Sequence, residues 1–289
     1  MINQAAANAS SGFEQRLKHA LENQALEVPM LPEVARKAVQ LAEDPNGDAS
    51  SMAKLIQGDQ TLAAQVIRIA NSAMYNPAGA SMVSLQQAIT RLGMKLLAEI
   101  AVAASLHAKL FDVPGYEDHV SATLKRALAS GLWAKEIARA ARKNVEAAFL
   151  GGLLHDIGRP VVLQLAVELA RRHKLALSES EICNLETKYQ RSVGTRVVNA
   201  WKMPSIVCSV VEHFGSYKEL NSSHQTQVMI AMAGALFADC FDRDETADEN
   251  KAALLESDLM ADLNFYQDDI EALFEKADVV NTTVGSLSL

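Results

Sequence analysis

The chain has 289 residues, of which 49% are hydrophobic and 21% are charged, a composition typical of a globular protein and not of a disordered one. Its formal net charge of −8 argues against a nucleic-acid binder that works by broad neutralisation of phosphates, because such a protein needs a basic face. The longest purely apolar run, residues 228–238, is about half of the roughly 20 residues that a membrane span requires, and no secretion signal opens the chain, so we expect a cytoplasmic protein without membrane insertion.

Helical periodicity runs through the first half of the chain. Apolar residues at spacings of three and four, which predict buried helical faces, recur at Phe13, Leu17 and Leu21, at Leu62, Val66, Ile69 and Ala70, and at Leu97, Ile100, Ala101 and Ala104. Asp48 and Asp59 precede two of these patterns as N-cap candidates, and Gly58 can end the helix between them. Ser84 has a glutamine three residues later, the spacing of a capping box, and Gly93 is expected to close that helix.

A change of composition at residues 111–118 separates the chain into two halves. This stretch, FDVPGYED, places a proline and a glycine between helical patterns, so we interpret it as a subdomain boundary. Helical spacing resumes beyond it at Leu132, Trp133, Ile137 and Ala141, and at Phe149, Leu150, Leu153 and Leu154. Gly158 followed by Pro160 fits the end of one helix and the first turn of the next, which places residues 155–156 in the last turn of the first. No stretch alternates apolar and polar residues convincingly, so the sequence predicts an all-α fold.

Several separated motifs, taken in order, resemble the HDOD domain, a regulatory relative of the HD-superfamily phosphohydrolases. They are LPEVARKAVQLAEDP (31–45), LIQGDQTLAAQVIRIANSAMYN (55–76), VSLQQAITRLG (83–93), AAFLGGLLHDIGRPVVL (147–163) and WKMP (201–204). The resemblance covers roughly residues 27–240 and implies two helical subdomains, an N-terminal one over residues 27–112 and an HD-like helical bundle over residues 113–240. Residues 1–26 would then form an N-terminal helical extension, and residues 241–289 an acidic loop and a C-terminal helix. Members of this family are implicated in bacterial signalling or regulation rather than in one established reaction.

The same resemblance directs attention to the pair His155 and Asp156. An HD-type hydrolase holds a divalent ion with a histidine, a His-Asp pair and a distant aspartate from separate helices, leaving positions open for water and phosphate. Ala129 stands where the resemblance would place the first histidine, and Gly234 stands where it would place the last aspartate. Asp239 follows five residues later, which is more than one helical turn away and off that face. The pair therefore looks like the remainder of a metal site.

Three readings of His155 and Asp156 stay open at this point. The two side chains can bond each other or nearby backbone and anchor a helix end, because buried polar groups need partners. They can form a weak metal site completed by His213, Glu212 or water. The third reading is a metal-free phosphate site that uses Arg159, whose planar guanidinium suits phosphate.

The remaining polar candidates have a structural and a functional interpretation each. Asp59 is a helix cap or a binding residue, and Asn71 is a turn residue or a contact for a ligand or partner. The acidic segment 239–250 is a solvated loop or a docking site. We expect no cofactor, with a divalent metal as the open alternative, and neither a disulfide framework nor a thiolate zinc site, because no CxxC spacing links the cysteines Cys183, Cys208 and Cys240.

Two functional classes follow. The favoured one is a non-catalytic signalling module that binds a protein partner or a small ligand and keeps a degenerate metal site. The alternative is a metal-dependent phosphohydrolase acting on a nucleotide or another phosphate ester. A cleft between the two subdomains is the expected binding surface, with residues 59–71 on one wall and residues 155–159 on the other.

Overall fold

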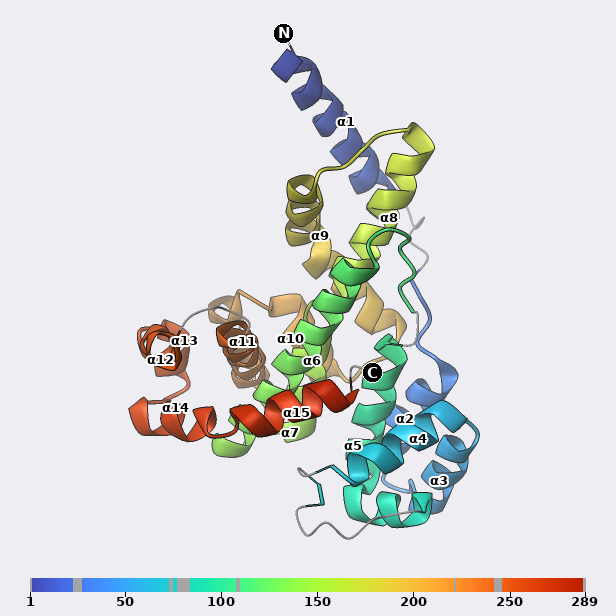
Figure 1. Cartoon of the computed structure of the whole chain (residues 1–289), viewed down its shortest axis with the longest axis vertical. Helices are drawn as coiled ribbons and strands as arrows, with labels where there is room; N and C mark the ends of the chain where they lie inside the picture. Colours follow the sequence, from blue (N-terminus) through green and yellow to red (C-terminus); the bar gives the residue numbers. More distant parts are fainter. Residues whose placement is uncertain are drawn as a thin grey trace.

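The computed structural model describes residues 2–22, 28–72, 75–76, 84–107, 110–220, 222–241 and 246–287, and every regular element in these residues is a helix (Figure 1). The prediction of an all-α fold with two helical subdomains is confirmed. None of the described helices is both long enough and apolar enough to span a membrane.

The N-terminal subdomain consists of α2 (Glu33–Glu43), α3 (Ala49–Gln57), α4 (Gln60–Ala70) and α5 (Leu85–His107). Its helix starts follow the predicted caps: the Asp48 carboxylate accepts hydrogen bonds from the N–H groups of the first turn of α3, and the Asp59 carboxylate does so for α4. Gly93 has φ of 77° and interrupts α5 with non-helical backbone, so the expected break lies where the glycine permits it. The apolar faces of α2, α3 and α4 pack against α5.

The second subdomain is a bundle around α6 (Figure 1). It consists of α6 (Glu117–Ala140), α7 (Val145–Leu154), α8 (Gly158–His173), α9 (Glu179–Ala200), α10 (Ser205–His213), the 3-10 turn η1 (Tyr217–Glu219) and α11 (Gln225–Cys240). α6 packs closely against both α7 and α11. Trp133 of α6 is fully buried and lies against Phe237 and Phe241, with ring centroids 5.1 and 5.0 Å away. The core of the bundle therefore surrounds the middle of α6.

The two subdomains meet through α5, which contacts α6 and α7. At this junction the ammonium group of Lys135 (α6) donates to the carboxylate of Glu99 (α5), and both side chains are buried. Lys135 also lies 5.3 Å above the ring of Phe149. A buried ion pair with an aromatic neighbour thus joins the two halves.

The ends of the chain add further helices. α1 (Ile2–Glu22) packs on α8, with Phe13, Leu17 and Leu21 buried as predicted. The described residues beyond 245 form α12 (Ala247–Leu255), α13 (Asp258–Asp262), α14 (Gln267–Phe274) and α15 (Ala277–Leu287), four helices where the sequence predicted one. Three short breaks, at residues 256–257, 263–266 and 275–276, divide the predicted helix. α15 contacts both α4 and α6, so the C-terminal segment bridges the two subdomains (Figure 1).

Candidate functional site

The pair His155 and Asp156 lies in the turn that joins α7 to α8. α7 ends at Leu154 and α8 begins at Gly158, so the pair follows directly on the last turn of α7. Gly158 is required there because a Cβ at this position would lie 1.9 Å from the carbonyl oxygen of Gln190 in α9. The turn packs closely on α9 there, and both residues of the pair are buried, 3% and 5% exposed.

His155 is fixed on three sides. Its Nδ1 lies 2.6 Å from the carbonyl oxygen of Gly152, and its Nε2 lies 3.3 Å from Oδ2 of Asp156. The imidazole stacks on Phe214, with ring centroids 4.3 Å apart and planes inclined by 25°. The contacts to the neighbouring acid and to nearby backbone are those that a structural role requires.

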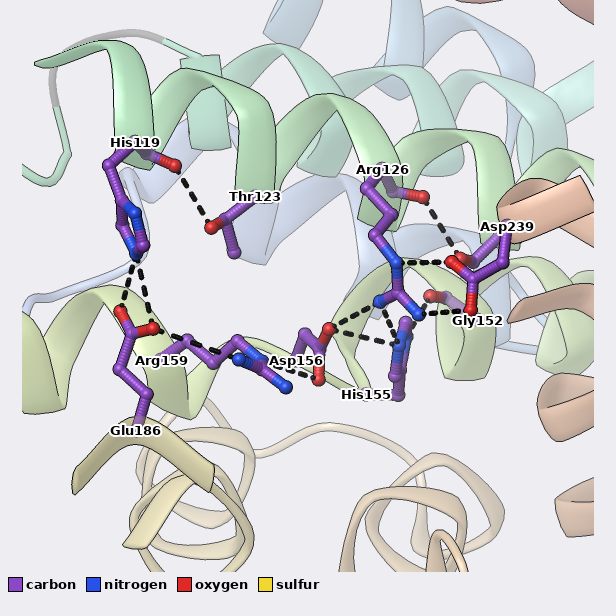
Figure 2. A network of polar contacts seen from close by, with 10 residues as sticks. His119, Thr123, Arg126, Gly152, His155, Asp156, Arg159, Glu186 and Asp239 are labelled. Carbon is purple, nitrogen blue, oxygen red and sulfur yellow. Dashed lines mark hydrogen bonds and ion pairs between the residues drawn. The ribbon is translucent and has the colours of Figure 1, made fainter. Parts of the chain in front are cut away.

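A cation from α6 joins the pair (Figure 2). Nη1 of Arg126 donates to Oδ2 of Asp156 at 2.7 Å and lies 3.5 Å from Nε2 of His155. Nε and Nη2 of the same guanidinium donate to the two carboxylate oxygens of Asp239 at 2.6 and 2.9 Å. Such a two-pronged arrangement is among the stronger ion-pair geometries in proteins. One guanidinium therefore connects a histidine and two aspartates.

Neither Arg126 nor the role of Asp239 was predicted. Asp239 lies five residues beyond Gly234, but the long side chain of Arg126 spans the gap to it at the end of α11. A sequence signal does exist: His119 and Arg126 are seven residues apart on α6 and therefore share one face. That spacing could have marked a polar stripe on a helix with a largely buried surface.

The polar contacts continue along α6 toward α9 (Figure 2). Nε of Arg159 lies 3.3 Å from Oδ1 of Asp156, and its Nη1 lies 3.7 Å from Oε2 of Glu186. Nε2 of His119 lies 2.9 and 3.1 Å from the two oxygens of Glu186, which is 1% exposed. We call the whole set the Arg126 network; its members are His119, Arg126, His155, Asp156, Arg159, Glu186 and Asp239. It ties together α6, α8, α9, α11 and the turn after α7.

Burial and ion pairing shift the pKa values of the two buried carboxyl groups, Asp156 and Glu186, in opposite directions. Burial alone would raise the pKa of Asp156, but His155, Arg159 and Arg126 outweigh it and hold this pKa well below its usual range. For Glu186 burial prevails, and its pKa is raised in spite of its ion-pair partners. Asp156 is therefore charged at neutral pH and depends on its cationic neighbours.

The donor set does not fit a metal centre of the HD type. Such a centre needs at least three protein ligands around one ion, with positions left open for water. Here the space between Asp156 and Asp239 holds the guanidinium of Arg126, a cation already bound to both carboxylates. Within the described residues no three histidine, cysteine, aspartate or glutamate side chains gather closely enough to hold an ion, so His213 is not brought to the pair as a third ligand.

The packing of α6 on α11 also argues against a metal centre of the HD type. A Cβ placed on Gly234 would lie 2.5 Å from the carbonyl oxygen of Ser130 and 2.7 Å from the amide nitrogen of Ala134. Gly152 of α7 is equally close to α6, since its Cβ would lie 2.8 Å from the Cα of Gly131. The helices touch through their backbones where the resemblance would place the missing ligands, beside Ala129 and at Gly234. This packing leaves no room for an aspartate side chain at position 234.

The three ligand or partner candidates named from the sequence have the following positions. Asp59 caps α4, its Oδ1 accepting from the N–H of Leu62 at 3.0 Å. Asn71 is the C-cap of the same helix, and its Nδ2 donates to the carbonyl oxygen of Ile67. Arg159 belongs to the Arg126 network. In the acidic segment 239–250, residues 242–245 lie outside the described residues, and Asp239 is bound by Arg126.

A cavity lies between the subdomains, at a different place from the predicted cleft. It is lined by residues of α2, α5, α7 and the N-terminal end of α10. Neither residues 59–71 nor residues 155–159 line it. The two polar regions predicted to face each other are thus not brought together across this cavity.

Comparison with known proteins agrees with the fold. The sequence model of the HDOD domain matches residues 28–216. An HDOD domain protein of unknown function from Geobacter sulfurreducens has a TM-score of 0.70 at 19% identity, covering 97% of this chain and 99% of its own. A protein named as a candidate metal-dependent phosphohydrolase from Shewanella amazonensis SB2B has a TM-score of 0.66 at 22% identity, covering 92% and 99%. A candidate signal transduction protein from Marinobacter aquaeolei VT8 has a TM-score of 0.64 at 22% identity, covering 96% of this chain and 66% of its own. No curated protein matches the chain in sequence.

Proposed function

Because this chain belongs to the HDOD domain family, we propose that it is a non-catalytic regulatory module that recognises a protein partner or a small ligand in a signalling pathway. Its two helical subdomains provide the surfaces that bind the partner or ligand, and the contact between the subdomains transmits the effect of binding. The guanidinium of Arg126 supplies positive charge where a hydrolase would hold a divalent ion.

The observation that carries the proposal is the placement of the Arg126 guanidinium among His155, Asp156 and Asp239. A metal ion promotes phosphate hydrolysis by binding water in an open position and lowering its pKa. A guanidinium also binds both carboxylates, but it carries one positive charge instead of two, has no coordination position and stays protonated. The side chains that could act as ligands are therefore used to bind a fixed internal cation.

Relatives point to two classes of function. One structural neighbour is named for metal-dependent phosphate hydrolysis and another for signal transduction. The Arg126 network favours the second class for this chain, because it ties four helices and one turn into a rigid unit without leaving an open metal position. Asp59, Asn71 and Arg159 remain the residues that we propose for contact with the ligand or partner.

A metal analysis combined with a phosphatase screen tests this function. We expect purified protein, after incubation with Mn²⁺ or Mg²⁺ and desalting, to retain less than one equivalent of metal. We also expect no turnover of phosphomonoesters, phosphodiesters or nucleotides above that of the His155→Ala variant. Turnover that depends on the metal and disappears in His155→Ala would establish the phosphohydrolase instead.

A further inference from the structure

A small cavity of about 100 Å³ separates the two subdomains. Its walls are largely apolar and come from four helices, with Val39 on α2, Ala98 on α5, Leu150 on α7 and Val207 on α10. An apolar protein cavity of about 150 Å³ is large enough to bind benzene. By that measure this cavity holds roughly four non-hydrogen atoms of a ligand. Any further atoms of a longer ligand would extend into the mouth of the cavity, where the exposed charged residues of the lining lie.

The charged groups that line the cavity are predominantly acidic. Glu43, Glu99 and Glu146 contribute three carboxylates, and Lys95 contributes the single ammonium among the lining residues. Lys95 and Glu146 form an ion pair at 3.7 Å between two side chains that are 64% and 39% exposed. Such a pair contributes little and exchanges readily, so it does not close the mouth.

Glu99 supplies a buried carboxylate to the wall. One of its oxygens, Oε2, accepts a hydrogen bond from Lys135, and the residue is 2% exposed. Burial raises the pKa of Glu99 in spite of the attraction of Lys135. A single ammonium therefore does not compensate fully for the lost hydration of this carboxylate, and a second cationic hydrogen-bond donor would stabilise its charged form.

We propose that this cavity binds a small primary amine, with its ammonium group at Glu99 and its alkyl chain among the apolar walls. The inference rests on the proposed regulatory function and names the chemical class of its ligand. An anion is disfavoured by the excess of carboxylates, and a neutral alcohol lacks the charge that Glu99 attracts. Because two walls belong to each subdomain, an occupant contacts both and favours one relative orientation of the two.

The test uses n-butylammonium as the probe on the full chain. Thermal melts and calorimetric titrations are run with n-butylammonium chloride, and n-butanol, sodium butyrate and sodium chloride serve as matched arms. We expect a saturable rise of Tm with n-butylammonium that the other three do not produce, because a ligand of the native state stabilises it. Equal shifts in the ammonium and sodium chloride arms, or no saturable binding at all, would overturn the proposal.

Three variants locate the binding site. Ala98→Leu fills the cavity and should abolish the shift, whereas Ala252→Leu on the exposed face of α12 adds the same volume elsewhere and should keep it. Glu43→Gln changes only an exposed residue at the mouth and should weaken binding several-fold, which keeps the test decisive if Ala98→Leu fails to fold. Undiminished binding by folded Ala98→Leu, or by Glu43→Gln, contradicts the site. Phosphatase turnover in the earlier screen would refute the proposed function alone, whereas missing amine binding without turnover would refute only this inference.

Discussion

Arg126 of α6 holds Asp239 of α11 through two hydrogen bonds, Nε to Oδ1 at 2.6 Å and Nη2 to Oδ2 at 2.9 Å. The side chain of Arg126 is 33% exposed and that of Asp239 is 28% exposed, so water weakens this pair only in part. The remaining nitrogen of the guanidinium, Nη1, donates to Asp156, whose side chain is 7% exposed. The cation thus links an accessible carboxylate at the end of one helix to a buried one between two others.

Replacing Arg126 by alanine should destabilise the fold. The change leaves Asp156 buried without its hydrogen-bonded cation, which costs about 2–3 kcal/mol of the free energy of unfolding. Chemical denaturation of the two proteins measures the difference. Arg172→Ala is the matched control, because Arg172 forms only an exposed pair with Glu168 one turn away and should change stability by less than about 0.5 kcal/mol. Equal effects of the two substitutions would show that the Arg126 network contributes nothing to stability.

Replacing Asp156 by alanine separates the structural reading from the metal reading. It removes the acceptor of Arg126 and the neighbour of His155, and we expect a loss of roughly 1–3 kcal/mol. This loss should be the same with added Mn²⁺ and with a chelator, because no bound ion takes part. Melts of wild type and variant under both conditions give the answer. A large chelator shift in wild type that is missing in the variant would mean that an ion stabilises the native state.

The low pKa of Asp156 predicts a loss of stability in acid. The pKa of this group is lowered in the folded protein, while in the unfolded chain it is near 3.9. Below about pH 4 the unfolded chain takes up a proton that the folded protein does not, so the contribution of Asp156 is present above that pH and is lost as the pH falls toward the lowered value. Asp156→Asn cannot titrate, so the gap in unfolding free energy between wild type and this variant should be widest near pH 7 and should narrow toward pH 3. A gap that is constant over this range would contradict the prediction.

Local features of this fold were predictable because their causes are local. Asp48 and Asp59 cap helices through N–H groups two or three residues away, and Gly93 breaks α5 through its own backbone conformation. Each of these signals lies within one helical turn of the structure that it specifies.

The centre of the site was not predictable in this way. Asp239 is 113 residues from Arg126 in sequence, and no local pattern records that pairing. Glu186 lies next to Leu185 on α9, and both are buried. The sequence gives no reason to bury this carboxylate, because its partners His119 and Arg159 come from other helices. Long-range ion pairs depend on how helices pack, and this packing is the part that the sequence alone left open.

The last prediction concerns Gly234, where α6 and α11 are in close contact. Gly234→Ala should destabilise the protein by about 2–3 kcal/mol, because its Cβ would lie 2.5 Å from the backbone oxygen of Ser130 and α11 would have to move away from α6. Gly285→Ala is the matched control: its Cβ meets nothing within 4 Å on α15, and alanine is the better helix former there, so stability should stay equal or rise by up to about 1 kcal/mol.

The bulkier variant Gly234→Asp tests whether an added carboxylate lets the protein bind a metal ion. The resemblance would place the missing carboxylate at this position, but the contact between α6 and α11 excludes it, and Arg126 already donates hydrogen bonds to both Asp156 and Asp239. We therefore expect Gly234→Asp to lose at least as much stability as Gly234→Ala and to bind no more Mn²⁺ than wild type, as measured by denaturation and by titration with the ion. A well-folded Gly234→Asp protein that takes up one equivalent of Mn²⁺ would show that the helices can separate to admit an ion, and that the guanidinium occupies the place of a metal only until a third ligand is supplied.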